Sequence, residues 1–513
     1  MIINNFKLTI HKIIGLLTIW QFISVALMAV GPWPPEVAII NFGLIAVFIL
    51  LAKPYYSLLL VILSIPFFVI LPNPIMANLP MWRVVFAWLF VVWLVHLLIN
   101  QRHWLARVFA IQRWQSDTPL TGAKLREIIT QSLKRIDSRL MPWDKVAVLF
   151  IVLAFCSLLI ARFPVHGLKQ IIFLLNIYVL YVVTVNVVTD RDKLKEIIRY
   201  TLYSLLIIVG WGFVQYFSSM FVEPYLFWQY WAMMFSALYY GTPLANVLAY
   251  SNSWFSFTGG SQSLRMFGVL PDTHAFGVMC IFLLAYLAPY LKWGRSGANK
   301  WYLMAAVALA SFGIMANGTR GIWLTLLAPL AIVLIAWGRK LLPQFMKIMA
   351  AMYGFIIILF ILSPFISQGL NLIRTYDTND NFLSRAGSIY DLTEDSNAGR
   401  LEIWQNSIKF AAMHPFGVGY GNFITSIVEN IPENASYEDV SGTKNLRYNL
   451  PQKFITAHSL YLQLLVELGF AGLLAFGLFW WEYFERLISF LRKHAGRLNH
   501  YAYLAISIAL AFI

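Results

Sequence analysis

Two arginines and one histidine, in three separate segments, have the side-chain types needed to handle a diphosphate and a hydroxyl group. Arg320 lies in NGTRGIW, Arg400 in NAGRLEIW and His458 in TAHSLYLQ. The planar guanidinium of arginine forms bidentate, charge-assisted bonds with phosphate oxygens. A histidine titrates near neutral pH, so it can accept a proton from an attacking hydroxyl. The set predicts transfer of a group from a lipid diphosphate to a hydroxyl acceptor, with arginine stabilising the leaving group and no metal required.

Four further residues extend this set. Arg265 and His274 lie in LRMFGVLPDTHAFG, where Arg265 is a third candidate for diphosphate binding and His274 a second titratable group. Ser459 directly follows His458, and Glu467 lies inside the apolar stretch that comes next. A charged acidic residue inside a membrane costs about 2.5–3.5 kcal/mol. Glu467 is therefore expected to pack inside a helix bundle, hydrogen-bonded or paired.

Each of these residues also has an ordinary structural explanation. A single external arginine is often an interface anchor, and a histidine at a helix start is often a cap. The glycine-rich GVGYGNF lacks the preceding strand and the following Lys-Ser/Thr of a phosphate-binding loop. Its glycines are expected to permit a tight turn after His414 and Pro415. The chemistry therefore depends on which residues the fold brings together.

The composition is that of a polytopic membrane protein. The 513 residues are 60% hydrophobic and only 12% charged, with a mean hydropathy of +0.69, whereas soluble domains carry about 25% charged residues. Cys156 and Cys280 both lie in apolar runs, which argues against a disulfide or a metal site built on them. The apolar segment 13–30 is long enough to remain as a spanning helix, so no cleavable signal peptide is expected.

Stretches of about 20 apolar residues predict membrane-spanning helices. We place them at 13–30, 36–52, 55–72, 83–99, 145–161, 170–188, 197–217, 275–291, 301–317, 321–338, 347–365 and 458–481. A thirteenth begins at residue 500 and stops at Ile513, so we expect the natural protein to continue further. The predicted fold class is an all-α integral membrane protein with about 12–13 transmembrane helices and one large external loop carrying short helices.

The lysines and arginines fix the expected direction of these spans. With the N-terminus in the cytoplasm, every internal loop is basic, whereas GPWPPE, LPNPIMANLP and FPVHG on the other side hold almost no Lys or Arg. The basic loops are those near 53, 100–144, 189–196, 292–300, 339–347 and 482–499. Much of the net charge of +15 is therefore an orientation signal that faces anionic lipid, and nucleic-acid binding is not needed.

This topology predicts five regions along the chain. They are N-terminal transmembrane helices over 1–217 with a basic cytoplasmic loop at 100–144, an external interfacial aromatic segment over 218–274, transmembrane helices over 275–365, a large external loop over 366–457, and C-terminal transmembrane helices over 458–513. Within the cytoplasmic loop, 124–136 reads as an amphipathic helix on the membrane surface. In the external loop, a helix is expected over 399–413, with Arg400 at its positive N-terminal end. All the candidate site residues except Glu467 then lie at the external face.

Two stretches resemble a known family. GRLEIWQNSIKFAAMHPFGVGYGNF, followed by AHSLYLQLLVELGFAGLLAF, is similar to the signature half of the bacterial O-antigen ligase/polymerase family, and NGTRGIW resembles the segment that carries that family's arginine at the outer end of an earlier helix pair. The resemblance covers roughly residues 260–481. The N-terminal half resembles the family only in hydropathy.

The resemblance implies a membrane glycosyltransferase of the GT-C type in the bacterial inner membrane, with its active site facing the periplasm and no cofactor or divalent metal. It implies that Arg320 and Arg400 hold undecaprenyl diphosphate and that His458 is the base or positions the acceptor. The implied partners are an undecaprenyl-diphosphate-linked glycan, lipid A-core or another glycan acceptor, and membrane lipid. Three positions differ from the family pattern: Ser459 stands where Asn is frequent, Thr319 where Ser is usual, and His274 where many members have Asn.

Several functions remain open at this stage. A ligase acting on lipid A-core, a polymerase acting on another lipid-linked glycan and an enzyme that glycosylates protein share these motifs, because acceptor choice lies in loops such as 218–264 and 425–453. The arginine and histidine spacing favours the ligase. A transporter or flippase of the same lipid-linked sugar would also need external arginines. Such transporters tend to have repeated halves, broken helices and midplane charges, and no repeat is visible here.

Overall fold

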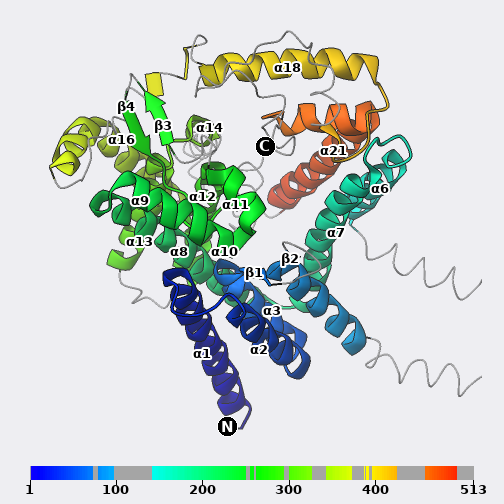
Figure 1. The fold of residues 1–513 in the computed structure, drawn as a ribbon. Helices are drawn as coiled ribbons and strands as arrows, with labels where there is room; N and C mark the ends of the chain where they lie inside the picture. The colour runs from blue at the N-terminus through cyan, green and yellow to red at the C-terminus, as the bar shows by residue number, and fades with distance from the viewer. Residues whose placement is uncertain are drawn as a thin grey trace, which may run out of the picture. The chain divides into compact units, whose positions relative to one another are not determined.

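The structure is a computed structural model that describes residues 2–72, 79–97, 141–249, 255–258, 261–293, 300–325, 343–372, 386–387, 389–391, 395–423 and 457–493. The described residues are almost entirely helical (Figure 1). The chain divides into two compact units. The first comprises Met1–Val92, Val179–Asp391 and Leu491–Ile513, and the second comprises Trp93–Tyr178 and Leu392–Phe490.

The first unit contains long and short helices. They are α1 (Ile2–Val30), α2 (Val37–Leu51), α3 (Pro54–Ser64), the helix Met81–Leu97 that runs on past the unit boundary, α8 (Arg191–Phe221), α12 (Thr273–Trp293), α13 (Lys300–Ala316), α14 (Arg320–Thr325) and α16 (Pro343–Asn371). A 3₁₀ turn, Ile65–Phe67, extends α3. The second unit contains α6 (Pro142–Ser157), most of α7 (Pro164–Val187), α18 (Asp395–Met413) and α21 (Leu460–Lys493).

Many of these helices are suited to a bilayer. Five are long and apolar enough to cross it: Thr9–Val30, Pro164–Val187, Arg191–Phe221, Ala350–Asn371 and Leu460–Arg486. Shorter apolar helices are Val37–Leu51, Pro54–Phe67, Met81–Leu97, Thr273–Leu287 and Trp301–Ala316. All ten coincide with predicted spans. The remaining predicted spans, 145–161 and 321–338, fall on α6 and on the start of α14. The prediction of an all-α membrane protein is confirmed.

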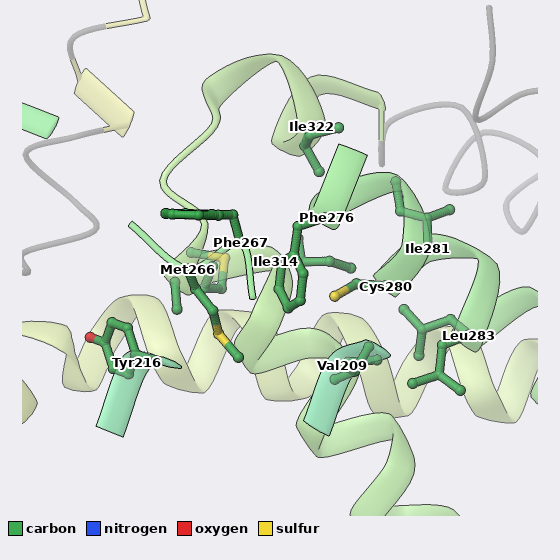
Figure 2. Close-up of a cluster of buried hydrophobic side chains, with 14 of the residues drawn as sticks. Val209, Tyr216, Met266, Phe267, Phe276, Cys280, Ile281, Leu283, Ile314 and Ile322 are labelled. Carbon is green, nitrogen blue, oxygen red and sulfur yellow. The ribbon is translucent and has the colours of Figure 1, made fainter. Parts of the chain in front are cut away.

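The main core of the first unit lies where α8, α12, α13 and α16 pack together. Its buried side chains include Val209, Phe276, Cys280 and Ile314, and Figure 2 shows them in one cluster. In a membrane, helices associate through close packing rather than through release of water from apolar surface. The core therefore gives the loops at the helix ends a rigid base.

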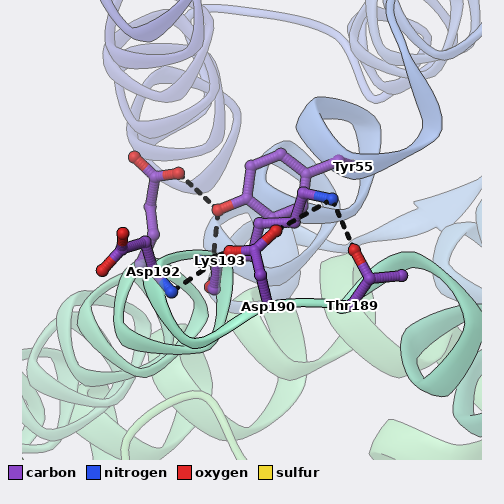
Figure 3. Close-up of polar contacts among 6 residues, drawn as sticks. Tyr55, Thr189, Asp190, Asp192 and Lys193 are labelled. Atoms are coloured by element: carbon purple, nitrogen blue, oxygen red, sulfur yellow. Dashed lines mark hydrogen bonds and ion pairs between the residues drawn. The ribbon is translucent and has the colours of Figure 1, made fainter.

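A polar network ties one end of α1, α3 and α8 together. Asp190 caps α8, because its Oδ1 accepts the backbone N–H groups of Asp192 at 3.1 Å and Lys193 at 2.8 Å. The Tyr55 hydroxyl donates to Glu196, and His11 Nε2 lies 3.0 Å from the same carboxylate. Figure 3 shows Tyr55 above the first turn of α8. These residues lie at the end of the helices that the charge pattern predicts to be cytoplasmic.

The aromatic segment after α8 folds back over the loop that follows β4. It contains α9 (Pro224–Trp228), a π-helical stretch (Gln229–Phe235), α10 (Ser236–Tyr240) and α11 (Thr242–Ala249). The indole of Trp231 donates to the Gly268 carbonyl at 3.1 Å, and the Tyr240 hydroxyl donates to the Val269 carbonyl. The segment therefore covers residues 265–269, which bear Arg265.

Two antiparallel hairpins, which the sequence analysis did not anticipate, accompany the helices. β1 (Ile70–Leu71) pairs with β2 (Leu79–Pro80), with Ile70 opposite Pro80. β3 (Phe255–Thr258) pairs with β4 (Ser261–Leu264), with Phe255 opposite Leu264. Strands of two or four residues are too short to show a periodic pattern in the sequence.

Other predictions about local structure have mixed outcomes. The helix expected over 399–413 begins at Asp395, so Arg400 lies in its second turn and not at its N-terminal end. The earlier start was missed because Asp395, Ser396 and Asn397 resemble capping residues more than helix formers. The amphipathic helix at 124–136, the rest of the loop up to residue 140, the segment 425–453 and the thirteenth span lie outside the described residues.

Candidate active site

Arg320 begins α14 directly after a tight turn that follows α13. Asn317 donates its N–H to the Gly313 carbonyl at 3.0 Å and accepts the N–H of Thr319 on its side-chain oxygen at 2.7 Å. The carbonyl of Thr319 then accepts the N–H of Ile322 at 3.0 Å, which starts the helix. Arg320 is only 8% exposed. The turn that precedes Arg320 therefore fixes the backbone from which this buried residue projects.

Arg265 binds this turn through its side chain. Its Nε donates to the Asn317 carbonyl at 2.9 Å and its Nη2 donates to the Thr319 hydroxyl at 2.8 Å. The Thr319 hydroxyl in turn donates to Thr273 at 2.9 Å. The structure thus brings the side chain of Arg265 into contact with Thr319, the residue next to Arg320. Arg265 and Arg320 are two of the three predicted diphosphate ligands. Two of the guanidinium's donors are used by the turn itself.

Gln215, which sequence reasoning missed, fixes the segment that carries Arg265. Its side-chain oxygen accepts the N–H groups of Phe267 and Gly268, both at 2.9 Å, and its amide nitrogen donates to the Arg265 carbonyl at 3.2 Å. Gln215 is fully buried in α8. A glutamine in the middle of an apolar span was the available signal, because a buried amide needs partners.

His274 lies in the first turn of α12 and is exposed. Asp272 caps this helix by accepting the N–H of Ala275 at 2.8 Å. The Nδ1 atom of His274 is 3.9 Å from the Asp272 carboxylate, and the histidine side chain is 53% exposed. His274 therefore lies on the same helix end as Thr273, which bonds the Arg320 turn.

His458 and Arg400 lie close together in the second unit. Figure 1 shows α18 lying across the end of α21, and the indole of Trp404 on α18 donates to the carbonyl of Ala457 at 2.9 Å. Arg400 is one turn before Trp404 on the same face of α18. Partial burial, together with the nearby positive charge of Arg400, lowers the pKa of His458. Burial also lowers the pKa of Arg400.

The backbone of His458 is strained. Its φ is +46°, and among the described residues it is the one non-glycine residue with a positive φ. Such a conformation costs of order 1–3 kcal/mol and is found most often at functional sites. Despite the partial burial of its imidazole, the residue as a whole remains exposed to solvent. Ser459 follows and begins α21, since its carbonyl accepts the N–H of Gln463 at 3.0 Å and its hydroxyl lies 3.4 Å from the N–H of Leu462.

Glu467 is buried and hydrogen-bonded. It is 3% exposed, and its two oxygens accept the N–H of Gly421 at 2.9 Å, the N–H of Phe423 at 3.4 Å and the amide of Gln463 at 3.2 Å. Gly421 and Phe423 belong to the glycine-rich loop after α18. In this loop Gly417, Gly419 and Gly421 have φ of +81°, +98° and +76°, so the tight turn expected there is present.

The predicted residues thus form two groups, one in each unit. Arg265 lies on the turn of Arg320 in the first unit, with His274 on the neighbouring helix end. Arg400 lies beside His458 in the second, with Ser459 and Glu467 on the helix that follows. In each group, residues far apart in the sequence are brought together by hydrogen bonds from a neighbouring helix or loop.

The comparisons with known proteins match the C-terminal part of the chain. Residues 305–477 match a family model described as O-antigen ligase. This range includes Arg320, Arg400, His458 and Glu467, and it leaves out Arg265 and His274. A search of curated proteins and a search of solved structures found no match. The chain therefore carries an O-antigen ligase family domain over residues 305–477, which confirms the resemblance drawn from its sequence.

Proposed function

We propose that this protein transfers a glycan from undecaprenyl diphosphate to a hydroxyl group of lipid A-core or another glycan acceptor, at the periplasmic face of the bacterial inner membrane. The observation that carries the proposal is the pair of His458 and Arg400, next to the start of α21 and inside the O-antigen ligase domain. The basic loops support a cytoplasmic N-terminus, and with that orientation this end of α21 would face outward.

His458 is proposed as the general base. Because its pKa is lowered, the imidazole is neutral at pH 7 and can accept a proton. In the proposed reaction the acceptor hydroxyl attacks the anomeric carbon of the donor sugar, while its proton passes to His458. The bond from the anomeric carbon to the diphosphate oxygen breaks, and undecaprenyl diphosphate leaves with the electron pair of that bond.

The arginines are proposed to bind the diphosphate that leaves. Arg400 lies beside the base, where a guanidinium can stabilise charge developing on the leaving oxygen. Arg320 follows a buried turn that Arg265 bonds at two places, and a turn fixed in this way suits preorganised recognition of a phosphate. Arg265 supports diphosphate binding through the two bonds that fix this turn. His274, exposed at the start of α12, remains the second titratable group proposed for the site.

A transporter or flippase of the lipid-linked sugar is the alternative, and one observation bears on it. α21 is broken at Gly469, two residues after Glu467, and a broken helix near an acidic residue is a feature of transporters. In those proteins the break exposes backbone groups to a substrate or ion. Here a loop of the protein itself bonds the backbone at the break, and both oxygens of Glu467 accept protein N–H groups. The geometry favours the enzyme.

The test is transfer by the purified protein in lipid bilayers, with EDTA present. The donor is an undecaprenyl-diphosphate glycan, and the acceptors are lipid A-core, a second lipid-linked glycan and a peptide. We expect transfer by the wild type and by the matched control Glu482→Gln, and loss of transfer in His458→Ala and Arg400→Ala. The acceptor that is consumed separates a ligase from a polymerase or a protein-modifying enzyme. Movement of donor across the bilayer without transfer would contradict the proposal and support a flippase.

A further inference from the structure

The helix that follows His458 is in two parts. At Gly469 the backbone has φ +66° and ψ −165°, which is not helical, so α21 consists of a short half, Leu460–Leu468, and a long half after the break. In a continuous helix the carbonyl of Val466 would accept the N–H of Phe470, and that of Glu467 the N–H four residues on. The break removes these bonds, and within a membrane each unsatisfied backbone group costs several kcal/mol.

The loop that directly follows α18 supplies the missing bonds. Val418 donates its N–H to the Val466 carbonyl at 3.0 Å, and Gly419 donates to the Glu467 carbonyl at 2.9 Å. In the other direction, Phe470 donates its N–H to the Pro415 carbonyl at 3.2 Å. The loop 414–423 therefore bonds the backbone on both sides of the break and replaces a turn of helix.

The fit between loop and break leaves no space for a side chain. A Cβ atom on Gly469 would lie 2.2 Å from the Pro415 oxygen, and one on Gly417 would lie 2.4 Å from the Glu467 oxygen. Both distances are far below van der Waals contact, and the atoms met are backbone atoms that cannot move aside. Both glycines also have positive φ. The loop and the break therefore pack backbone against backbone, and a side chain at either glycine would prevent this packing.

Glu467 adds the side-chain bonds that hold the far end of the loop. Its oxygens accept the N–H groups of Gly421 and Phe423, while Gln463, one turn earlier, donates to the same carboxyl group. The loop's opposite side is fixed as well. Tyr420 donates its N–H to the Ser157 hydroxyl of α6 at 2.9 Å, and the side-chain oxygen of Asn422 accepts the N–H of Phe163 at 2.9 Å.

We infer that Glu467 is a positioning residue, which locks the loop 414–423 into the break of α21 and so fixes His458 against Arg400. The short half-helix that begins after His458 is attached to α18 at two places. Trp404 bonds Ala457 at its start, and the loop that ends α18 bonds Val466 and Glu467 at its end. His458 lies between these two attachments, and Arg400 lies one turn before Trp404 on α18. This inference rests on the proposed role of His458 as the base.

Glu467→Gln is the sharpest variant, because it keeps the size of the side chain. An amide has one acceptor oxygen and an NH₂ group, so one of the three N–H donors would face another donor. Gly469→Ala disturbs the same contact between loop and break, but through the backbone and not through the Glu467 side chain. The matched controls lie further along α21: Glu482→Gln removes a partly exposed carboxylate, and Gly477→Ala adds a methyl group where no atom lies within 4 Å.

The experiment measures two things on the full-length protein in lipid nanodiscs: hydrogen exchange of peptides covering 414–423, and the kinetics of glycan transfer. We expect Glu467→Gln and Gly469→Ala to raise exchange in the loop and to lower kcat by about 10-fold or more, because each breaks buried hydrogen bonds that hold the loop. The KM for the donor should change by less than about twofold, because the diphosphate ligands are untouched. Exchange in α6 and α7 should stay at the wild-type level, which shows that the variants are folded, and both controls should match the wild type.

Three results would overturn the inference, and they can be told apart. Wild-type kcat in Glu467→Gln, with transfer intact in the wild-type protein, would refute the positioning role and leave the proposed function standing. A wild-type protein that transfers no glycan would refute the proposed function, and the positioning role with it. Equal loss of kcat and of donor binding would also refute it, since that pattern indicates general unfolding.

Discussion

The two groups of candidate site residues, one in each unit, are held by different means. The Arg320 turn is fixed by side chains: Arg265 bonds its carbonyl and hydroxyl groups, and Gln215 bonds the segment that carries Arg265. The His458 half-helix is fixed mainly by backbone-to-backbone bonds from the loop 414–423. Arg320 is buried, whereas His458 is exposed. The difference suits their proposed tasks, because a phosphate ligand gains from rigidity and a base must be open to an acceptor.

The largest effect is expected for the exposed residue of this comparison, His458. His458→Ala should lower kcat by about 10²–10⁴-fold, the usual contribution of a general base, while the KM for the donor stays nearly unchanged. Steady-state transfer kinetics with varied donor and acceptor will measure this. A loss confined to KM would show that His458 binds substrate and does not act as the base.

The second-largest effect is expected in the group that contains the buried Arg320. Gln215→Leu leaves the N–H groups of Phe267 and Gly268 without their acceptor, at about 1–3 kcal/mol for each buried group. We expect a lower melting temperature and weaker donor binding, since the segment carrying Arg265 loosens. Thermal unfolding in detergent and a donor-binding assay will measure this, with Gly210→Ala on the same helix as the control. Unchanged donor affinity despite a lower melting temperature would show that Gln215 contributes to stability and not to diphosphate binding.

The pH dependence of kcat sharpens the comparison, because the base titrates and the arginines do not. The base form of His458 is neutral, so activity should rise as pH increases through its pKa. That pKa is lowered from the ordinary value of 6.5, which places the acid limb of the profile below this pH. Arg400→Lys keeps the charge and should leave the limb in place, whereas residual activity of Arg400→Ala should show a limb moved to higher pH. A limb that does not move in Arg400→Ala would contradict the electrostatic coupling.

The smallest effect is expected at Thr319, where this chain departs from the family pattern. Thr319→Ser keeps the hydroxyl that accepts from Arg265 and donates to Thr273, so activity should stay within about twofold. Thr319→Val removes both bonds with little change of shape and should weaken donor binding by about 10-fold. Equal activity of the two variants would show that the side-chain bonds of the turn are dispensable.

Much of the helical architecture could be predicted from the sequence. Apolar runs marked the spans, because a run of this length has few alternatives to a membrane helix. The local chemistry of single residues was also legible: a glutamate in an apolar helix predicted a buried, bonded side chain, and the glycines after Pro415 predicted a turn. These inferences depend on the residue and its near neighbours alone.

The features that were missed depend on distant parts of the chain. VELGFAG around Gly469 reads as continuous helix, and the break is stable only because a loop some fifty residues earlier bonds it. Gln215 reads as one polar residue in a span, and its partners Phe267 and Gly268 are likewise about fifty residues away. The early start of α18 at Asp395 was missed for a local reason, since its first residues favour caps. Hydrogen bonds between distant segments leave no periodic pattern, so sequence reasoning cannot place them.

The broken helix also bears on how the protein is made. The loop 414–423 precedes α21 in the chain, so it is synthesised before that helix enters the bilayer. The groups that complete the backbone of α21 are therefore already present when this helix is synthesised. We expect the last spans to insert poorly if the order of these two segments is reversed, because a helix with exposed carbonyl groups would meet lipid before it met its partner. The order in which the loop and α21 are synthesised therefore matters for forming the bonds of this site.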